Sequence, residues 1–160
     1  MASLREKHEQ HYHRAMADFR KAAAAGSANA MFNIGVLYAD GQGVPQDYAK
    51  AMEWYRKGAA AGSGRAMASI GDLYDYGHGV PQDYAKAMEW YRKGAAAGSR
   101  LAMFGIGYLY DQGQGVPQDY AKALRWMRKA EASGDPLVAA LAKMVIAKIK
   151  QAQAAQNSGQ

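Results

Sequence analysis

Four titratable residues near the N-terminus are the first candidates for chemistry in this 160-residue chain. They are His8, Glu9, His11 and His13, and imidazole and carboxylate groups are common zinc ligands. The helical zinc motif His-Glu-x-x-His places its histidines four positions apart, whereas His8 and His11 are three apart. His11 and His13 would point to different sides of a helix. We therefore predict no metal site and no cofactor.

Asp72 and Asp75 are a second candidate, because two carboxylates can act as acid and base in a hydrolysis. They lie one turn apart on an expected helix, and nothing in the sequence raises the pKa of one selectively. His78 lies between two glycines where the other copies of its loop have glutamine, which indicates a variable loop tip rather than a catalytic base. The chain also lacks the Ser-x-x-Lys, Gly-x-Ser-x-Gly and phosphate-loop motifs. We therefore predict that the protein is not an enzyme.

The elements that carry these residues belong to an internal repeat of 36 residues. Val-Pro-Gln begins at Val44, Val80 and Val116, and the phrase VPQDYAKAMEWYRKGAAAGS occurs identically at the first two. A fixed period of this length indicates a solenoid. The expected units are an N-terminal half repeat at 1–27, repeats at 28–63, 64–99 and 100–135, and a capping helix with a disordered tail at 136–160.

Each repeat is predicted to contain two helices, at about 29–40 and 48–61 in the first copy. Gly41 suits the left-handed backbone at a helix C-terminus, Pro45 cannot continue that helix, and Asp47 can cap the next one. Apolar residues recur at helical spacing in both segments. The fold class predicted is therefore all-α.

The N-terminal helix, expected from about Leu4 to Ala25, matches the second helix of a repeat. It carries Asp18 where the first repeat has Trp54, which fits an end unit with no preceding neighbour.

The C-terminal helix, expected from Pro136 to about Ala155, has apolar residues on two faces. The face expected to cap the stack carries Leu137, Leu141, Met144, Val145 and Lys148. Val138, Ile146 and Ile149 lie off that face, and this second apolar surface could support a homodimer through the helix.

Composition and charge bear on the compartment of the protein and on its partners. The chain has no cysteine, so it contains no disulfide and no thiolate zinc site. It has no apolar segment of membrane-spanning length, and residues 1–16 lack the apolar core of a signal peptide. We expect a cytoplasmic or recombinant soluble protein that does not bind membranes; whether a signal peptide was removed is left open. The net charge is +6, but the lysines of the second helices alternate with glutamates along one stripe of mixed sign. This pattern indicates a solvated face and makes nucleic acid an unfavoured partner.

The glycine, turn and aromatic positions together resemble the Sel1-like repeat family, which is similar to tetratricopeptide repeats. In the first repeat these positions are Ala30, Ile34, Gly35, Tyr38, Gly41, Gly43, Val44, Asp47, Ala51, Trp54, Tyr55, Lys57 and Gly62. The resemblance covers about residues 12–135. It implies a right-handed superhelix of paired antiparallel helices and a non-enzymatic adaptor that binds proteins or peptides.

Two departures from the family pattern bear on origin. Some secreted members have a disulfide in each repeat, which this cysteine-free chain cannot form. The near-identity of the repeats favours an engineered or consensus-based array, with recent internal duplication as the alternative.

The repeats differ mainly on the first helix, at positions 29, 33, 36 and 40 and their equivalents. At about 100° per residue these positions form one exposed stripe, with Phe32 and Phe104 at its edge. The resemblance places first helices on a concave face. The candidate ligand-binding residues are Asn29, Phe32, Asn33, Val36, Asp40, Arg65, Ser69, Asp72, Tyr76, Leu101, Phe104, Tyr108 and Gln112.

The expected ligand is a protein or peptide with apolar anchors and some basic residues, because the stripe combines aromatic and acidic side chains. Three alternatives stay open. The stripe could have drifted as tolerant surface, the array could be purely structural without a ligand, or it could bind RNA. Against RNA, Arg65 is the only basic residue among the stripe positions.

Overall fold

The computed structural model describes residues 3–159, which form eight helices and no strand. The helices are α1 (Leu4–Ala24), α2 (Ala28–Asp40), α3 (Tyr48–Ala60), α4 (Gly64–Tyr76), α5 (Tyr84–Ala96), α6 (Arg100–Gln112), α7 (Tyr120–Glu131) and α8 (Pro136–Ser158). The predicted all-α class is confirmed. Residues 1–2 of the expected half repeat and residue 160 of the expected tail lie outside the described residues.

Local hydrogen bonds explain where each helix pair begins and ends. Helix α2, the first helix of its repeat, is followed by Gly41 as its C-cap, whose φ of 66° is left-handed. The backbone N–H of Gly41 donates to the carbonyl of Leu37. The Asp47 side chain then accepts the Lys50 N–H at 3.0 Å and caps α3. The Asp47 N–H donates to the Tyr38 carbonyl at 2.9 Å, which ties the two helices together. The next two repeats make the same hydrogen bonds, so the capping residues seen in the sequence set the helix boundaries in every repeat.

Close packing within a pair depends on a glycine in the first helix. A Cβ atom on Gly35 would overlap the ring of Tyr55, and one on Gly71 would overlap the ring of Tyr91. The missing side chain therefore lets the second helix approach closely enough to bury its tyrosine.

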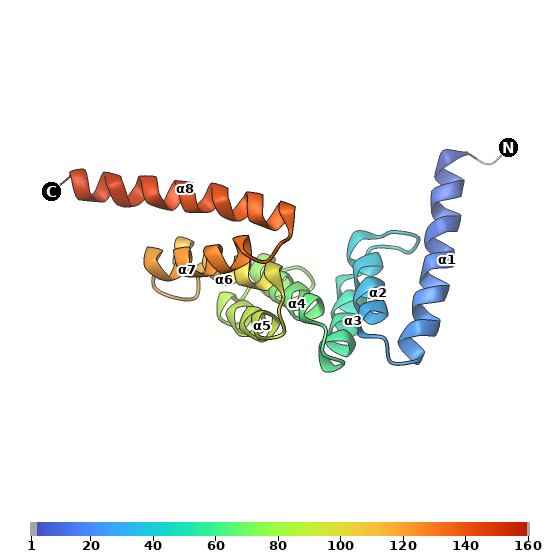
Figure 1. Ribbon diagram of the computed structural model, residues 1–160. Helices are drawn as coiled ribbons and strands as arrows, with labels where there is room; N and C mark the ends of the chain where they lie inside the picture. The colour runs from blue at the N-terminus through green and yellow to red at the C-terminus, as the bar shows by residue number, and fades with distance from the viewer. Residues whose placement is uncertain (1–2, 160) are drawn as a thin grey trace.

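Successive pairs stack through their first helices. In residues 3–159, α2 contacts α4, α4 contacts α6 and α6 contacts α8, whereas α3, α5 and α7 do not contact one another. This asymmetry curves the stack with α2, α4 and α6 on its inner side. Figure 1 shows α1 and α8 at opposite ends of the row that α2 to α7 form.

The C-terminal helix packs mainly through the second of its two apolar faces, not the one expected to cap the stack. Val138, Ile146 and Ile149 are buried, whereas Leu137 and Met144 are each 69% exposed. The expectation that the latter face caps the stack is therefore wrong, and the surface expected to support a homodimer lies inside the protein.

The register of α8 relative to its N-cap explains which face is buried. Asp135 caps α8 as Ser99 caps α6, so Val138 and Ile146 take the positions of the buried Ala102 and Tyr110. The helix also continues to Ser158, beyond the expected end at Ala155, so the segment expected to be disordered is helical up to that residue. No helix in the described range is long and apolar enough to cross a membrane.

Candidate functional site

The inner face presents all the predicted ligand-binding residues with at least partial exposure. The exposed ones are Asn29, Asp40, Arg65, Asp72, Tyr76, Leu101, Tyr108 and Gln112. The partly buried ones are Phe32, Asn33, Val36, Ser69 and Phe104. The chemistry of these residues changes along the stack, so the face divides into three parts.

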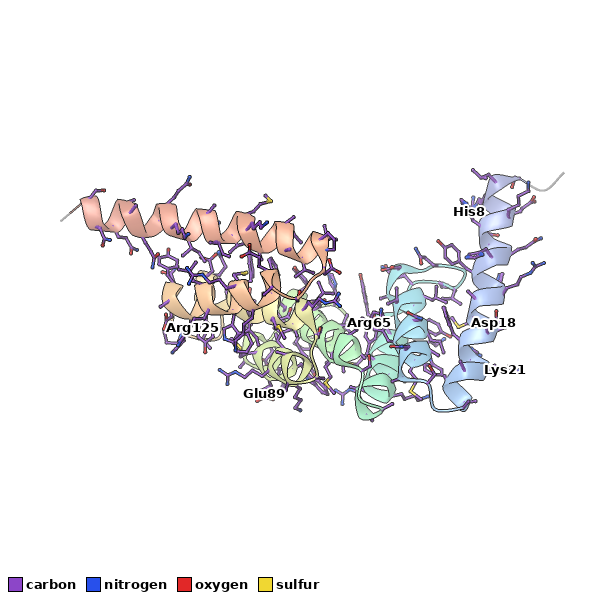
Figure 2. The ribbon with its side chains drawn as sticks, in the orientation of Figure 1. His8, Asp18, Lys21, Arg65, Glu89 and Arg125 are labelled. Carbon is purple, nitrogen blue, oxygen red and sulfur yellow. The ribbon has the colours of Figure 1, made fainter. Side chains whose placement is uncertain are left out.

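In the N-terminal part of the face, polar groups satisfy one another. Arg65 of α4 donates from Nη2 to Asn29 Oδ1 at 3.1 Å, and its Cζ lies 4.4 Å from the centroid of the Phe32 ring. Figure 2 shows Arg65 between α2 and α4, whereas Glu89 and Arg125 lie on the outer side of the stack. The three residues at the α2–α4 junction are therefore already engaged with each other.

In the central part, a tyrosine from a second helix reaches the inner face. Tyr91 of α5 is only 2% exposed, and its hydroxyl oxygen lies 2.7 Å from Asp72 Oδ1 and 3.1 Å from Asp75 Oδ2. A Cβ atom on Gly105 of α6 would lie 2.8 Å from the Tyr91 ring. Gly105 thus leaves room for the ring between α4 and α6, and we call Asp72, Asp75 and Tyr91 the central cluster.

The central cluster occurs in one repeat only. Asp72 and Asp75 correspond to Val36 and Ala39 in the preceding repeat, and Met127 takes the place of Tyr91 in the following one. The sequence analysis did not single out Tyr91 or its hydroxyl. The available signal was Gly105, a residue without a side chain at a stripe position.

Removal from water and the neighbouring charge of Asp75 raise the pKa of the Asp72 carboxyl to about 6, although the hydrogen bond from Tyr91 acts in the opposite direction. Asp72 as a whole residue is nevertheless exposed. Burial also raises the pKa of Asp75. Burial and the two carboxylates raise the pKa of Tyr91, so its hydroxyl keeps its proton near neutral pH. The pKa values of both carboxyls are thus raised, and that of Asp72 by a large shift, which the sequence did not predict.

Two aromatic side chains stand beside the central cluster. Tyr76 is 65% exposed and Tyr108 is 39% exposed. The ring of Tyr76 is 5.7 Å from that of His78, which stacks at 4.7 Å on Tyr48 of the preceding repeat. His78 therefore lies in the exposed loop between α4 and α5 and supports the orientation of Tyr76.

The C-terminal part of the face is apolar. Leu101 is 51% exposed and borders a hollow of about 310 Å³ between the N-terminal ends of α6 and α8. Arg100 and Asp135 close one side of this hollow with an ion pair of 3.3 Å. Phe104 differs from Leu101 because it packs against the buried cluster that contains Met127, so it contributes to stability as well as to the surface.

The histidine-rich segment lies on α1, far along the chain from the central cluster. His8, Glu9 and His13 border a groove of about 760 Å³ between α1 and the loop at residues 41–45. Within residues 3–159, no group of three or more His, Asp or Glu side chains is arranged to hold a metal ion.

Stacked antiparallel helix pairs with a varied inner face define an α/α repeat solenoid. The family model described as "Sel1 repeat" matches residues 28–63, 64–99 and 100–135. The chain therefore belongs to the Sel1 repeat family, whose members typically act as non-enzymatic scaffolds for protein interactions.

Solved structures agree with this assignment. A Sel1 repeat protein from Oxalobacter formigenes is 33% identical over 83% of this chain and 53% of its own, with a TM-score of 0.73. The protective antigen c5321 of uropathogenic Escherichia coli strains, described as displaying an SLR fold, is 39% identical, with a TM-score of 0.69. The match covers 77% of this chain and 26% of c5321, so this chain spans only part of either relative.

Helicobacter pylori cysteine rich protein B shares the fold at 21% identity and a TM-score of 0.62, over 79% of this chain and 96% of its own. A comparison with curated proteins gives no match.

Proposed function

We propose that this Sel1 repeat protein binds a protein or peptide segment on the inner face formed by α2, α4 and α6. The observation that carries the proposal is the exposure of Tyr76, Leu101 and Tyr108 on that face. When a partner removes large side chains of this kind from water, the free energy of binding becomes more favourable. They also occupy positions that differ from repeat to repeat, whereas the sequences of α3 and α5 are identical.

The outer face is a weaker candidate, because its aromatic side chains already have partners. Lys57 Nζ lies 4.2 Å from the Trp54 ring centroid, and Lys93 Nζ lies 4.3 Å from that of Trp90. Both tryptophans are also partly buried. A ligand on this side would have to displace these cations before it reached an aromatic surface.

The test is a selection from a random peptide display library against the parent protein and a Tyr76→Ala/Tyr108→Ala variant. Phe104 is left unchanged, because its replacement would also disturb the packing of α8. A Glu53→Ala/Glu89→Ala variant provides the control, since both residues are exposed on the outer helices. We expect one motif to be enriched on the parent and the control, and lost on the tyrosine variant.

Two results would contradict the proposal. The same motif enriched equally on the tyrosine variant would place binding elsewhere. No enrichment on any of the three proteins would favour a structural array without a peptide ligand. A random single-stranded RNA pool added as competitor checks the nucleic-acid alternative, and we expect it to leave the enriched motif unchanged.

A further inference from the structure

The inner face does not end at the third repeat, because α8 takes the place of a fourth first helix. It contacts α7 and α6 as α6 itself contacts α5 and α4. With Asp135 aligned to Ser99 as the N-cap, the exposed Leu137 and Met144 take the positions of Leu101 and Tyr108. The predicted stripe therefore continues onto α8.

The exposed residues of α8 make this continuation apolar. Leu137 and Met144 are each 69% exposed, and Leu141, at the position of Gly105, is 40% exposed. Together with Leu101, they form what we call the apolar end of the inner face. Exposed apolar side chains that lie next to one another mark interaction surfaces.

The centre of the same face has the opposite character. Asp72 and Asp75 accept hydrogen bonds from Tyr91, and the ion pairs found in residues 3–159 do not include either carboxylate. The inner-face cation next to them in the stripe, Arg65, is engaged with Asn29 and Phe32. In a chain with a net charge of +6, the exposed Asp72, with Asp75 buried beside it, therefore gives the centre of the face an acidic site without a cationic partner.

We infer that the occupant of the inner face is a segment that carries a basic side chain for the central cluster and an apolar side chain for the apolar end. This inference rests on the proposed function and specifies its ligand. Packed helices lie about 8–10 Å apart, so the two steps from α4 to α8 span roughly 20 Å. An extended segment rises about 3.3 Å per residue, which places the basic and apolar residues about six positions apart.

The charge pattern also sets the orientation of the segment. Its basic residue faces α4 and its apolar residue faces α8, because a second basic residue near α8 would meet the exposed Lys148, which takes the stripe position of Gln112. The partner is therefore amphiphilic along its length rather than uniformly basic.

An array of synthetic peptides tests the inference. Each peptide carries Arg and Leu separated by about two to about ten Gly/Ser positions, with control series that replace Arg by Glu or Leu by Ser. The proteins compared are the parent, Asp72→Asn/Asp75→Asn and Leu141→Ser/Met144→Ser. Matched controls are Glu53→Gln/Glu89→Gln for the lost carboxylates and Leu4→Ser, on the exposed N-terminal turn of α1, for the lost apolar surface.

The parent is expected to bind best near a separation of six and to bind the Glu and Ser series at least about ten-fold more weakly. The aspartate variant should lose its preference for Arg and keep that for Leu, and the α8 variant should do the reverse. Circular dichroism melts confirm that each variant is folded.

The outcomes separate the inference from the proposed function. If peptides bind the parent and lose binding to Tyr76→Ala/Tyr108→Ala, but neither the aspartate nor the α8 variant changes any preference, the inference is wrong and the inner-face function stands. If no peptide of the array binds the parent above a Gly/Ser peptide, and the display selection also enriches nothing, both are wrong.

Discussion

Replacing Asp72 by asparagine is expected to stabilise the protein near neutral pH. The folded state raises the pKa of this carboxyl from 3.8 to about 6, so the ionised form is less favourable in the folded chain than in the unfolded chain. At about 1.4 kcal/mol per pKa unit, the full shift in the Asp72 pKa would lower the free energy of unfolding by about 3 kcal/mol. Because the residue is exposed, solvent screening reduces this to about 1 kcal/mol.

The sign of the pH dependence follows from the same values. Below pH 3.8 the carboxyl is protonated in both states, so the cost of ionisation is absent and the Asp72 contribution is most favourable. As the pH rises through about 6, Asp72 must ionise in the folded protein, close to Asp75, and that stability is lost. The hydrogen bond from the Tyr91 hydroxyl offsets only part of this cost. The asparagine amide can still accept the hydrogen bond from Tyr91 but carries no charge.

The assay is urea unfolding followed by circular dichroism at pH 7.5 and pH 4, with Glu89→Gln on the outer side of α5 as the control. We expect Asp72→Asn to gain about 1 kcal/mol, or about 2–4 °C in Tm, at the higher pH and a clearly smaller amount at the lower pH. The control should stay within about 0.5 kcal/mol of the parent at both. A destabilised Asp72→Asn protein at pH 7.5, or a gain that does not change with pH, would refute the reasoning.

Three further predictions concern the packing and the caps. Gly71→Ala should lower stability by about 1–3 kcal/mol, although alanine is the better helix former, because its Cβ would overlap the Tyr91 ring; an unchanged or raised Tm would contradict the close-approach argument. Asp47→Ala should cost about 1 kcal/mol through loss of the α3 cap, measured by urea unfolding, and a retained midpoint would show that the Lys50 N–H has another partner. Ile146→Ala should lower the free energy of unfolding by about 2–4 kcal/mol and Met144→Ala by less than about 0.5 kcal/mol. The reverse order in thermal melts would show that α8 packs through the face that carries Met144.

The helices could be predicted from the sequence because their boundaries depend on local interactions. Gly41, Pro45 and Asp47 act within a few residues of their own positions, and the repeat shows the same signals three times. The stripe of candidate residues could be predicted for the same reason, since helical periodicity alone decides which positions share a face.

The central cluster and the packing of α8 could not be predicted, because both depend on contacts between helices. Tyr91 and Asp72 are 19 residues apart and meet only because Gly105, on a third helix, leaves space for the ring. On α8, the sequence offered two apolar faces, and the register that begins at the Asp135 cap buries the one that carries Val138.

The central claim is that the inner face recognises a protein segment, and mapping a bound peptide tests it most directly. A peptide enriched in the display selection would be titrated into isotopically labelled protein, with amide chemical shifts followed by nuclear magnetic resonance. We predict that the largest changes centre on Tyr76, Leu101 and Tyr108 and extend onto Leu141 of α8. Changes centred on α3 and α5, or on the groove between α1 and residues 41–45, would contradict the claim.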